Sequence, residues 1–329
     1  MTPLQSPIHS GFGPASTAQD VLAGIDLSGK TAIVTGGHAG LGLETTRALR
    51  QAGARVIVPA RDVTRAREAL GELGVDVAAM DLMDPSSIDA FAAAFVASGA
   101  PLHILINNAG IMACPLTRDA RGFEAQFATN HLGHYQLTVR LWPALVRAQG
   151  ARVVALSSLG HRYAAVDIDD PNFERREYDC WIAYGQSKTA NALFALELDA
   201  LGKASRVRAF SVHPGRILTD LAKHMSREDL RNAGALDDEG RPVIDLSRGM
   251  KSPAQGAATS LWAATSPLLD GLGGVYCEDC DIAALAPDTD ATHAGSGAMA
   301  SGVRPWAVDP AAAKQLWALS ETLTGVRIG

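Results

Sequence analysis

The chain has 329 residues, of which 47% are hydrophobic and 19% are charged, and its formal net charge is −6. This length suits one large α/β domain, and the acidic balance argues against a nucleic acid or an anionic membrane as the partner. The sequence has no run near the ~18 to 20 apolar residues that span a membrane, and no basic start or apolar core of a signal peptide. We therefore expect a cytoplasmic protein with a small-molecule partner.

An N-terminal extension over residues 1–27 precedes the first predicted strand. Residues 1–15 are expected to be disordered or to lie loosely on the surface. The run from Ser16 to Leu22 predicts a short capped helix.

A glycine-rich turn follows the predicted strand over residues 30–35. Gly36, Gly40 and Gly42 separate this strand from a helical pattern that begins at Leu43. In such a context the glycines allow a sharp turn, and backbone N–H groups can approach a diphosphate at the positive end of the helix. The alternative is a glycine-rich turn that binds no ligand.

Tyr184 and Lys188 are four positions apart and therefore neighbours on one face of a helix. A nearby cation favours the phenolate, so we expect the lysine to lower the tyrosine pKa from ~10 toward working pH. Such a phenol is a candidate general acid/base. The alternative is a surface pair that came about by chance.

The spacing Thr-Gly-x-x-x-Gly-x-Gly over residues 35–42, together with Tyr-x-x-x-Lys, resembles the short-chain dehydrogenase/reductase family. Further motifs match in the family's order: Asp81-Leu82 after the apolar run from Val75, Asn107-Asn108-Ala109-Gly110 after the strand 102–106, Asn130 in a long helical segment, Ser157-Ser158 after the strand 152–156, and Pro214-Gly215 with Thr219 after the strand 207–212. The resemblance covers roughly residues 28–280. It implies a single doubly wound, mainly parallel Rossmann-type sheet with helices on both faces, within one domain over residues 28–329.

The resemblance also implies a catalytic group of Asn130, Ser158, Tyr184 and Lys188. Ser158 would hydrogen-bond the substrate carbonyl while Tyr184 exchanges a proton with its oxygen. Lys188 would hold the nicotinamide ribose and lower the tyrosine pKa, and Asn130 would position a water that links Lys188 to solvent. Ser157 is an alternative to Ser158 because either ends the strand, but the family commonly uses the second serine of such a pair.

The dinucleotide-binding residues implied by the family are Gly36, His38, Gly40, Leu41, Gly42, Arg61, Asp81, Leu82, Asn108, Ala109, Gly110, Tyr184, Lys188, Pro214, Gly215, Ile217 and Thr219. An acidic residue after the second strand (55–61) would bond a free ribose 2′-hydroxyl, whereas Arg61 can hold a 2′-phosphate. We therefore expect NADP(H). NAD(H) stays possible because Asp62 follows and Ala39 is not basic, and Arg61 could instead be a solvated residue that starts a helix.

The interval from Ser158 to Tyr184 is about twice that of the family's shortest members. The extra residues, 160–181, are rich in charged and aromatic side chains. This length and the ending Tyr-Gly-Gln-Ser-Lys-x-Ala-Asn resemble the retinol-dehydrogenase-like branch, which acts on lipophilic carbonyls and alcohols. Members of that branch often carry a membrane anchor, and none is expected here.

Two further segments lie outside the motifs. Residues 219–253 form a long insertion after the Pro-Gly strand, at the carboxyl edge of the sheet, where a substrate lid is expected. The alternative is a solvent-exposed amphipathic segment with no role at the site. We call these residues the lid segment. A C-terminal extension follows over residues 281–329.

We expect no cysteine or histidine to take part in the chemistry. Cys277 and Cys280 have no second ligand pair nearby, so we expect two thiols after the last core strand and no metal site. The five histidines near the motifs are expected to be hydrogen-bonded structural residues, with His161 the one worth testing near the substrate: His38, His131, His134, His161 and His213.

The sequence thus predicts an NADP(H)-dependent oxidoreductase that interconverts a medium-sized, partly apolar carbonyl and its alcohol, with Tyr184 as general acid/base. Two alternatives stay open: a dinucleotide-sensing protein without catalysis, and a reductase of an activated carbon–carbon double bond. A homodimer or homotetramer is possible, since family members commonly pair through the helices that carry Asn130 and Tyr184.

Overall fold

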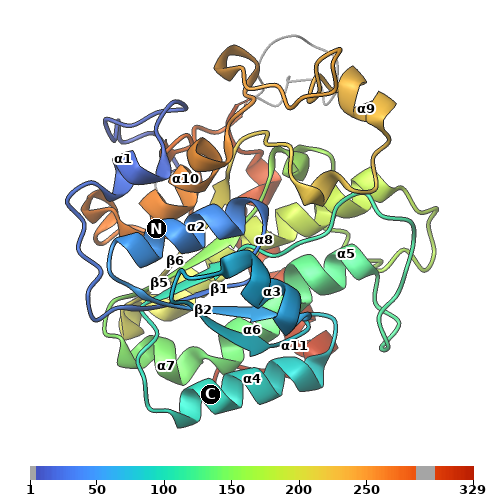
Figure 1. Ribbon diagram of the computed structural model, residues 1–329. Helices are drawn as coiled ribbons and strands as arrows, with labels where there is room; N and C mark the ends of the chain where they lie inside the picture. Colours follow the sequence, from blue (N-terminus) through green and yellow to red (C-terminus); the bar gives the residue numbers. More distant parts are fainter. Residues whose placement is uncertain (1–4, 287–300) are drawn as a thin grey trace.

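A computed structural model describes residues 5–286 and 301–329, and it contains one eight-stranded sheet in the order β3-β2-β1-β4-β5-β6-β7-β8 (Figure 1). Neighbouring strands are parallel except β7 and β8, which are antiparallel. The strands are β1 (Thr31–Val34), β2 (Arg55–Ala60), β3 (Asp76–Ala79), β4 (Ile104–Asn107), β5 (Ala151–Leu156), β6 (Val207–His213), β7 (Val275–Glu278) and β8 (Asp281–Ile282). This arrangement confirms the predicted fold class.

Helices cover both faces of the sheet. The α-helices are α1 (Ala18–Leu22), α2 (Gly40–Gln51), α3 (Val63–Leu70), α4 (Pro85–Ala97), α5 (Ala125–Phe127), α6 (Gly133–Arg140), α7 (Trp142–Arg147), α8 (Cys180–Gly202), α9 (Arg227–Asn232), α10 (Pro253–Thr265) and α11 (Pro310–Thr324). A π-helical turn, η1 (Ala128–Leu132), joins α5 to α6. The 3₁₀ turns are η2 (Leu159–Arg162), η3 (Lys203–Ser205), η4 (Asp220–Ala222), η5 (Leu246–Arg248), η6 (Pro267–Leu269) and η7 (Pro305–Ala307).

The central strands are buried on both faces, which explains their continuous apolar sequences. In β1, Ala32 and Val34 join the core beneath α1, α2 and α10, whereas Ile33 joins the core beneath α4, α6 and α8. Successive side chains of a strand point to opposite faces, so each strand contributes to both cores. The strand order reverses between β1 and β4, and a crevice opens at the carboxyl ends of the strands at such a switch point.

The N-terminal segment does not lie loosely on the surface as expected. The Gln5 side chain donates to the carbonyl oxygens of Tyr276 and Ala283, at 2.9 and 2.6 Å, and the backbone N–H groups of Ile8 and Ser10 donate to the Asp281 carboxylate. These residues follow the outer edge of the sheet, where β8 leaves backbone groups available. The predicted capped helix is confirmed as α1, in which Thr17 and Asp20 form a capping box.

The C-terminal helix α11 packs along α8, on the side of the molecule away from α1 and α10 (Figure 1). Trp317 of α11 stacks on Phe194 of α8 with ring centroids 5.9 Å apart and contacts Tyr135 of α6 edge-on. Ser320 of α11 hydrogen-bonds His131 in η1 at 2.7 Å. The chain thus covers one face of α8 with its own last helix.

Within residues 5–286 and 301–329, no helix is both long and apolar enough to cross a bilayer. Part of the expected C-terminal extension, residues 287–300, and the first four residues of the N-terminal extension lie outside the described residues.

Candidate active site

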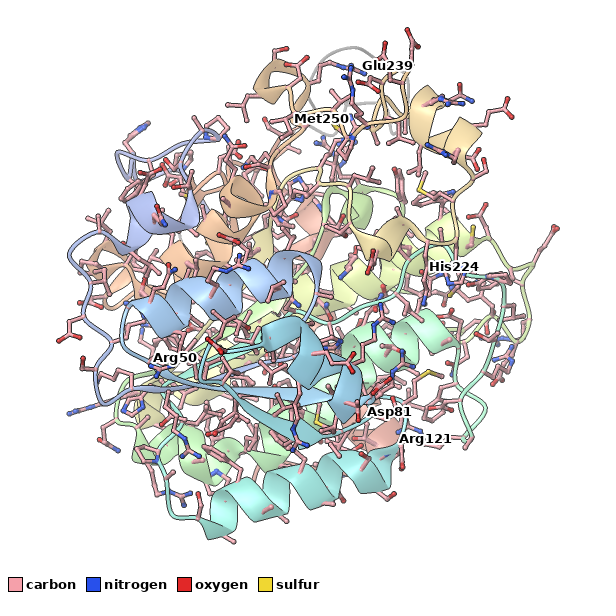
Figure 2. The ribbon with its side chains drawn as sticks, viewed as in Figure 1. Arg50, Asp81, Arg121, His224, Glu239 and Met250 are labelled. Carbon is pink, nitrogen blue, oxygen red and sulfur yellow. The ribbon has the colours of Figure 1, made fainter. Side chains whose placement is uncertain are left out.

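A cleft of about 870 Å³ opens at the carboxyl ends of β1, β2, β4, β5 and β6. Most of the sequence-predicted site residues line it: Gly36, His38, Gly40, Leu41, Gly42, Arg61, Leu82, Asn108, Ala109, Gly110, Ser158, Tyr184, Lys188, Pro214, Gly215, Ile217 and Thr219. Asp81 and Asn130 are not among the lining residues. The Asp81 carboxylate instead accepts the N–H of Met83 at 2.9 Å and shapes the turn before α4. Asp81 is labelled in Figure 2.

The glycine-rich turn presents the free N-terminus of α2 to the cleft. Its N-cap residue, Ala39, offers no side-chain hydrogen bond, whereas α3, α4, α8, α10 and α11 are all capped by an Asp or Ser side chain. A Cβ on Gly42 would stand 2.2 Å from the carbonyl oxygen of Gly36, so only glycine lets the turn close. Uncapped N–H groups at the positive end of a helix suit a diphosphate. These residues therefore fit a dinucleotide.

Basic side chains gather at the end of β2. Arg61 and Arg65 line the cleft together with His38 and Asp62. Burial and the two arginines lower the pKa of His38, and its Nδ1 atom is buried without a hydrogen-bond partner. The sequence analysis missed Arg65, although it lies one helical turn after Arg61 and could have been found from that spacing.

Two glycines let the turn η2 and the helix α8 approach each other closely. A Cβ on Gly160 would lie 2.7 Å from the Tyr184 ring, and a Cβ on Gly185 would lie 2.7 Å from the Gly160 carbonyl oxygen. The turn η2 therefore packs directly on α8, and the hydroxyl of Ser158, its N-cap, and the Tyr184 ring both lie beside Gly160. Ser157 instead points into the protein, where its hydroxyl donates to the Lys188 carbonyl at 2.8 Å. Both serines line the cleft, but the hydroxyl proton of Ser157 is committed to the Lys188 carbonyl, which leaves Ser158 as the candidate donor to a substrate.

The pKa of Tyr184 differs from our expectation. Burial raises it to about 12, although the neighbouring Ser158 side chain acts in the opposite direction on this pKa. Burial also lowers the pKa of Lys188 to about 8. The Lys188 Nζ atom donates to the Leu156 carbonyl at 3.1 Å and lies 5.5 Å from the centroid of the Tyr184 ring. Desolvation dominates both shifts because removing water penalises the ionised phenolate and the ionised ammonium alike.

Asn130 lies in the π-helical turn η1, behind the cleft, and is fully buried. Its side-chain Oδ1 accepts the Ile111 N–H at 2.9 Å, and its Nδ2 donates to the Ile111 carbonyl and to the Ser187 hydroxyl. Gly110 separates it from the lysine, since a Cβ there would lie 3.0 Å from Asn130 Oδ1 and 3.6 Å from Lys188 Nζ. The asparagine side chain thus joins the strand β4 loop to the helix α8.

The far end of the cleft is lined by apolar side chains that no motif predicted: Met112, Tyr163, Trp181, Met225, Leu230 and Met250. They come from three separate segments: the loop after β4, the insertion before α8, and the lid segment. Trp181 contacts Tyr184 edge-on, with ring centroids 6.3 Å apart. This wall depends on how distant segments fold together, and local spacing carries no signal for it.

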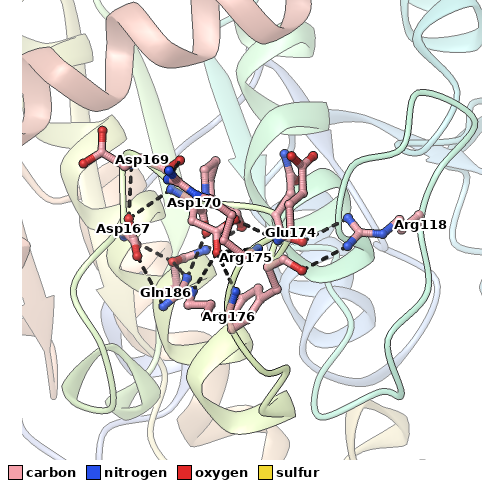
Figure 3. A network of polar contacts seen from close by, with 11 residues as sticks. Arg118, Asp167, Asp169, Asp170, Glu174, Arg175, Arg176 and Gln186 are labelled. Carbon is pink, nitrogen blue, oxygen red and sulfur yellow. Dashed lines mark hydrogen bonds and ion pairs between the residues drawn. The ribbon is translucent and has the colours of Figure 1, made fainter.

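A polar network fixes the insertion before α8 (Figure 3). Gln186, two positions after Tyr184, is fully buried; it accepts from the Asp167 N–H at 3.1 Å and from Arg176 at 2.6 Å. Its amide donates to the Pro171 carbonyl at 2.8 Å. On the other side of the insertion, Arg118 donates to two of its carbonyl oxygens. The charged residues of the insertion therefore serve to hold it on helix α8.

The lid segment rises above the cleft mouth, with Met250 near its base and Glu239 at its outer end (Figure 2). Its last residues pair with the chain just before it: the Arg216 N–H donates to the Gly249 carbonyl, and the Lys251 N–H donates to the Arg216 carbonyl. Buried Lys251 also forms a 2.5 Å ion pair with Asp279, in the turn between β7 and β8. Cys277 lies within β7 rather than after it, and all four cysteines are free thiols.

Comparisons with known proteins agree with this geometry. A family model described as short chain dehydrogenase matches residues 30–230. The chain belongs to the short-chain dehydrogenase/reductase family. It is 43% identical over 300 residues to a probable oxidoreductase of Streptomyces lividans, an alignment that covers 89% of this chain and 97% of that protein. This dehydrogenase/reductase is also 40% identical over 263 residues to retinol dehydrogenase 12 of Mus musculus, with 78% and 79% covered.

A solved structure shares the fold over nearly the whole chain. It is the crystal structure of an uncharacterized protein from Mycobacterium paratuberculosis, with a TM-score of 0.71 and 32% sequence identity, covering 95% of this chain and 99% of that one. The family membership, with its retinol-dehydrogenase-like character, establishes nicotinamide-dependent oxidoreduction as the general activity.

Proposed function

We propose that this protein is an NADP(H)-dependent oxidoreductase that interconverts a ketone or aldehyde and the corresponding alcohol. One observation carries the proposal: Ser158, Tyr184 and Lys188 line the same cleft as the uncapped end of α2. A hydroxyl pair at one end of a dinucleotide cleft suits a substrate oxygen that gains or loses charge.

The residues of the cleft would share the work of carbonyl reduction. The dinucleotide, when bound, supplies the hydride. Ser158 would donate a hydrogen bond to the substrate oxygen and so orient the carbonyl. Tyr184, which burial holds in its neutral form, would give its proton to that oxygen, and Lys188 would stabilise the phenolate that results. For oxidation the same steps run in reverse, with the tyrosine as base.

Three groups at the end of β2 support a preference for NADP(H). Arg61 and Arg65 both line the cleft there, and His38 carries a buried nitrogen without a partner. Two guanidinium groups suit a 2′-phosphate better than a free hydroxyl. We expect Arg61→Ala and Arg65→Ala each to raise the NADPH Kd by about tenfold or more, the loss of one charge-assisted hydrogen bond, with little change for NADH.

The apolar wall supports a medium-sized, partly apolar substrate. Met112, Trp181 and Met250 border the side of the cleft beyond Tyr184. The lid segment, whose last residues pair with Arg216 just before it, would order over this wall when cofactor or substrate binds. A homodimer or homotetramer is compatible with this function if its contacts avoid the face of α8 that α11 covers.

A substrate panel tests the proposed function directly. Absorbance of the reduced nicotinamide is followed with ketones and aldehydes of increasing apolar size, with NADPH and NADH in parallel. Consumption of NADPH with an apolar carbonyl supports the proposal. Binding of NADPH without turnover of any panel member would favour the non-catalytic sensor, and turnover of an activated carbon–carbon double bond alone would favour that reductase.

A further inference from the structure

His134, on α6, joins two parts of the site that are far apart in sequence. Its Nδ1 lies 3.0 Å from the carbonyl oxygen of Asn130, and its Nε2 lies 2.8 Å from the hydroxyl of Thr35. Both contacts are buried, and the histidine is 2% exposed. Thr35 directly precedes the glycine-rich turn, whereas Asn130 belongs to the proposed proton-handling group.

The contacts of this histidine determine the direction of each hydrogen bond. A carbonyl oxygen only accepts, so Nδ1 must carry the proton toward Asn130. The neutral ring then leaves Nε2 as an acceptor, and the Thr35 hydroxyl donates to it at 2.8 Å in preference to the Ile106 carbonyl, which lies 3.4 Å away. With its proton directed at His134, that hydroxyl keeps its lone pairs for the N–H groups of Asn108 and Ala109, each 2.9 Å away.

Burial keeps the histidine uncharged, which this pattern requires. The pKa of His134 falls to about 4, chiefly because the ring is desolvated, and the Lys188 ammonium on α8 lowers it further. His131, one helical turn earlier on the same face, is likewise neutral, with a pKa of about 3. A protonated His134 would turn Nε2 into a donor and remove the acceptor that Thr35 uses.

The Asn130 end of the link lies against the catalytic helix. The carbonyl that His134 holds belongs to the π-helical turn, and the Asn130 side chain bonds Ile111 and Ser187, the residue before Lys188. The Thr35 end holds the backbone of Asn108 and Ala109, which line the cleft. One side chain therefore contacts both the turn that would bind the dinucleotide and the turn that would position the proton-handling residues.

We propose that His134 is a positioning residue that acts through both of its ring nitrogens. Its Nε2 holds the Thr35 hydroxyl, which in turn binds the backbone of Asn108 and Ala109, and its Nδ1 holds the π-helical turn that contains Asn130. The proposal rests on the proposed function for the role of Asn130, and on the dinucleotide cleft alone for the role of Thr35. It predicts that the two nitrogens have separable effects.

Two near-isosteric variants divide the contacts. In His134→Asn the side-chain amide can replace Nδ1 as donor to Asn130 but does not reach Thr35. In His134→Gln the side-chain oxygen can replace Nε2 as acceptor from Thr35, but the donor to Asn130 is lost. We expect His134→Asn to raise the NADPH Kd by about tenfold and to leave kcat at saturating NADPH within about twofold of the wild type. We expect His134→Gln to lower kcat by about tenfold and to leave the NADPH Kd within about twofold.

The Kd is measured by fluorescence titration with NADPH and does not require turnover. It is repeated with Thr35→Val and with Thr35→Val combined with His134→Asn. If the histidine acts through the threonine, the combined variant binds NADPH no more weakly than Thr35→Val alone. A thermal unfolding curve gives the folded fraction of each variant, and the protein concentration used to calculate Kd and kcat is corrected for that fraction.

The proposal is overturned if both histidine variants change Kd and kcat by the same factor, as a general loss of folded protein would do, or if neither changes either quantity. It is also overturned if the Thr35 and His134 effects on Kd are additive. Should the wild type turn over no carbonyl, the proposed function fails, and the pattern of Kd values alone still decides the Thr35 half of this inference.

Discussion

The two ends of the cleft are built in different ways. The dinucleotide end consists of backbone and glycines on the sheet edge: a Cβ on Gly42 would meet the Gly36 carbonyl, and α2 presents bare N–H groups. The substrate end consists of long side chains from three inserted segments, held by polar contacts such as those of Gln186 and by the ion pair of Lys251. The first end allows almost no change of shape, whereas the second can be altered by single side chains.

This difference predicts where substitutions will act. Changes at the glycine turn should affect cofactor binding and leave the apolar wall intact, while changes in the insertion, or in the lid segment beyond Thr219, should affect the carbonyl substrate and leave the dinucleotide affinity unchanged. Buried neutral histidines lie behind both ends, so acid should weaken the whole structure at once.

The largest expected effect is therefore on stability in acid. His131, His134 and His161 are fully buried, with pKa values lowered to about 3, 4 and 4. Below pH ~6.5 these histidines bind a proton in the unfolded chain but stay neutral in the folded chain. The free energy of unfolding therefore falls by about 1.4 kcal/mol for each histidine and each pH unit. From pH 7.5 to pH 5 the three together cost on the order of 6 kcal/mol.

Urea unfolding followed by tryptophan fluorescence at pH 7.5, 6 and 5 measures this loss. We expect the midpoint to fall steadily below pH 6.5. An equal midpoint at pH 5 and pH 7.5 would show that these rings accept protons in the folded protein.

Gly42→Ala should produce the next largest effect. The added methyl group would stand 2.2 Å from a backbone oxygen that cannot move away. Overpacking of this kind costs ~1–3 kcal/mol, which corresponds to a loss of NADPH affinity of up to about a hundredfold. Gly13→Ala is the matched control, since a Cβ there meets nothing within 4 Å. Equal NADPH affinities in the two variants would contradict the rigid-turn account.

Gln186→Leu probes the other end. The leucine has a similar volume but leaves the Asp167 N–H and the Pro171 carbonyl without their side-chain partner, while Arg176 keeps its contacts with Asp170. Loss of these buried bonds costs ~1–3 kcal/mol, and the insertion should shift away from Trp181. We expect the KM for an apolar carbonyl to rise by about tenfold while the NADPH Kd stays constant. A parallel rise of both constants would mean that the two ends are not separable.

Lys251→Met should have the smallest effect. The ion pair with Asp279 joins the base of the lid segment to the turn between β7 and β8, and the Asp279 side chain is 34% exposed and can be rehydrated. We expect a rise of about threefold to tenfold in substrate KM, in line with ~1 kcal/mol. The control is Arg241→Ala, which removes an exposed ion pair within the lid segment. If the control changes KM equally, the base of the segment has no special role.

The sequence predicted the fold class and most residues of the cleft because their signals are local. Gly42 and the pair formed by Tyr184 and Lys188 are recognisable from spacing within a single turn or helix, and the order of the motifs fixes their strands. The hydrogen-bonding directions of Ser157 and Ser158 could not be predicted, since they depend on Gly160 and its contact with α8.

Other features depend on distant parts of the chain. The Thr35 and His134 contact joins residues 99 positions apart. The ordered N-terminal segment needs the edge of β8, and the pKa of Tyr184 is raised by a burial that no short pattern reports. Arg65 is the exception, because its helical spacing from Arg61 was visible in the sequence.

The most direct test of the central claim is Tyr184→Phe. Removing the phenolic oxygen removes the proton donor but keeps the ring that packs on Gly160 and Trp181. The account predicts a fall in kcat of about 10²- to 10⁴-fold with an unchanged NADPH Kd, while Tyr163→Phe, which removes the hydroxyl of the other tyrosine that lines the cleft and keeps its ring, retains its kcat. Turnover by Tyr184→Phe at the wild-type rate would contradict it.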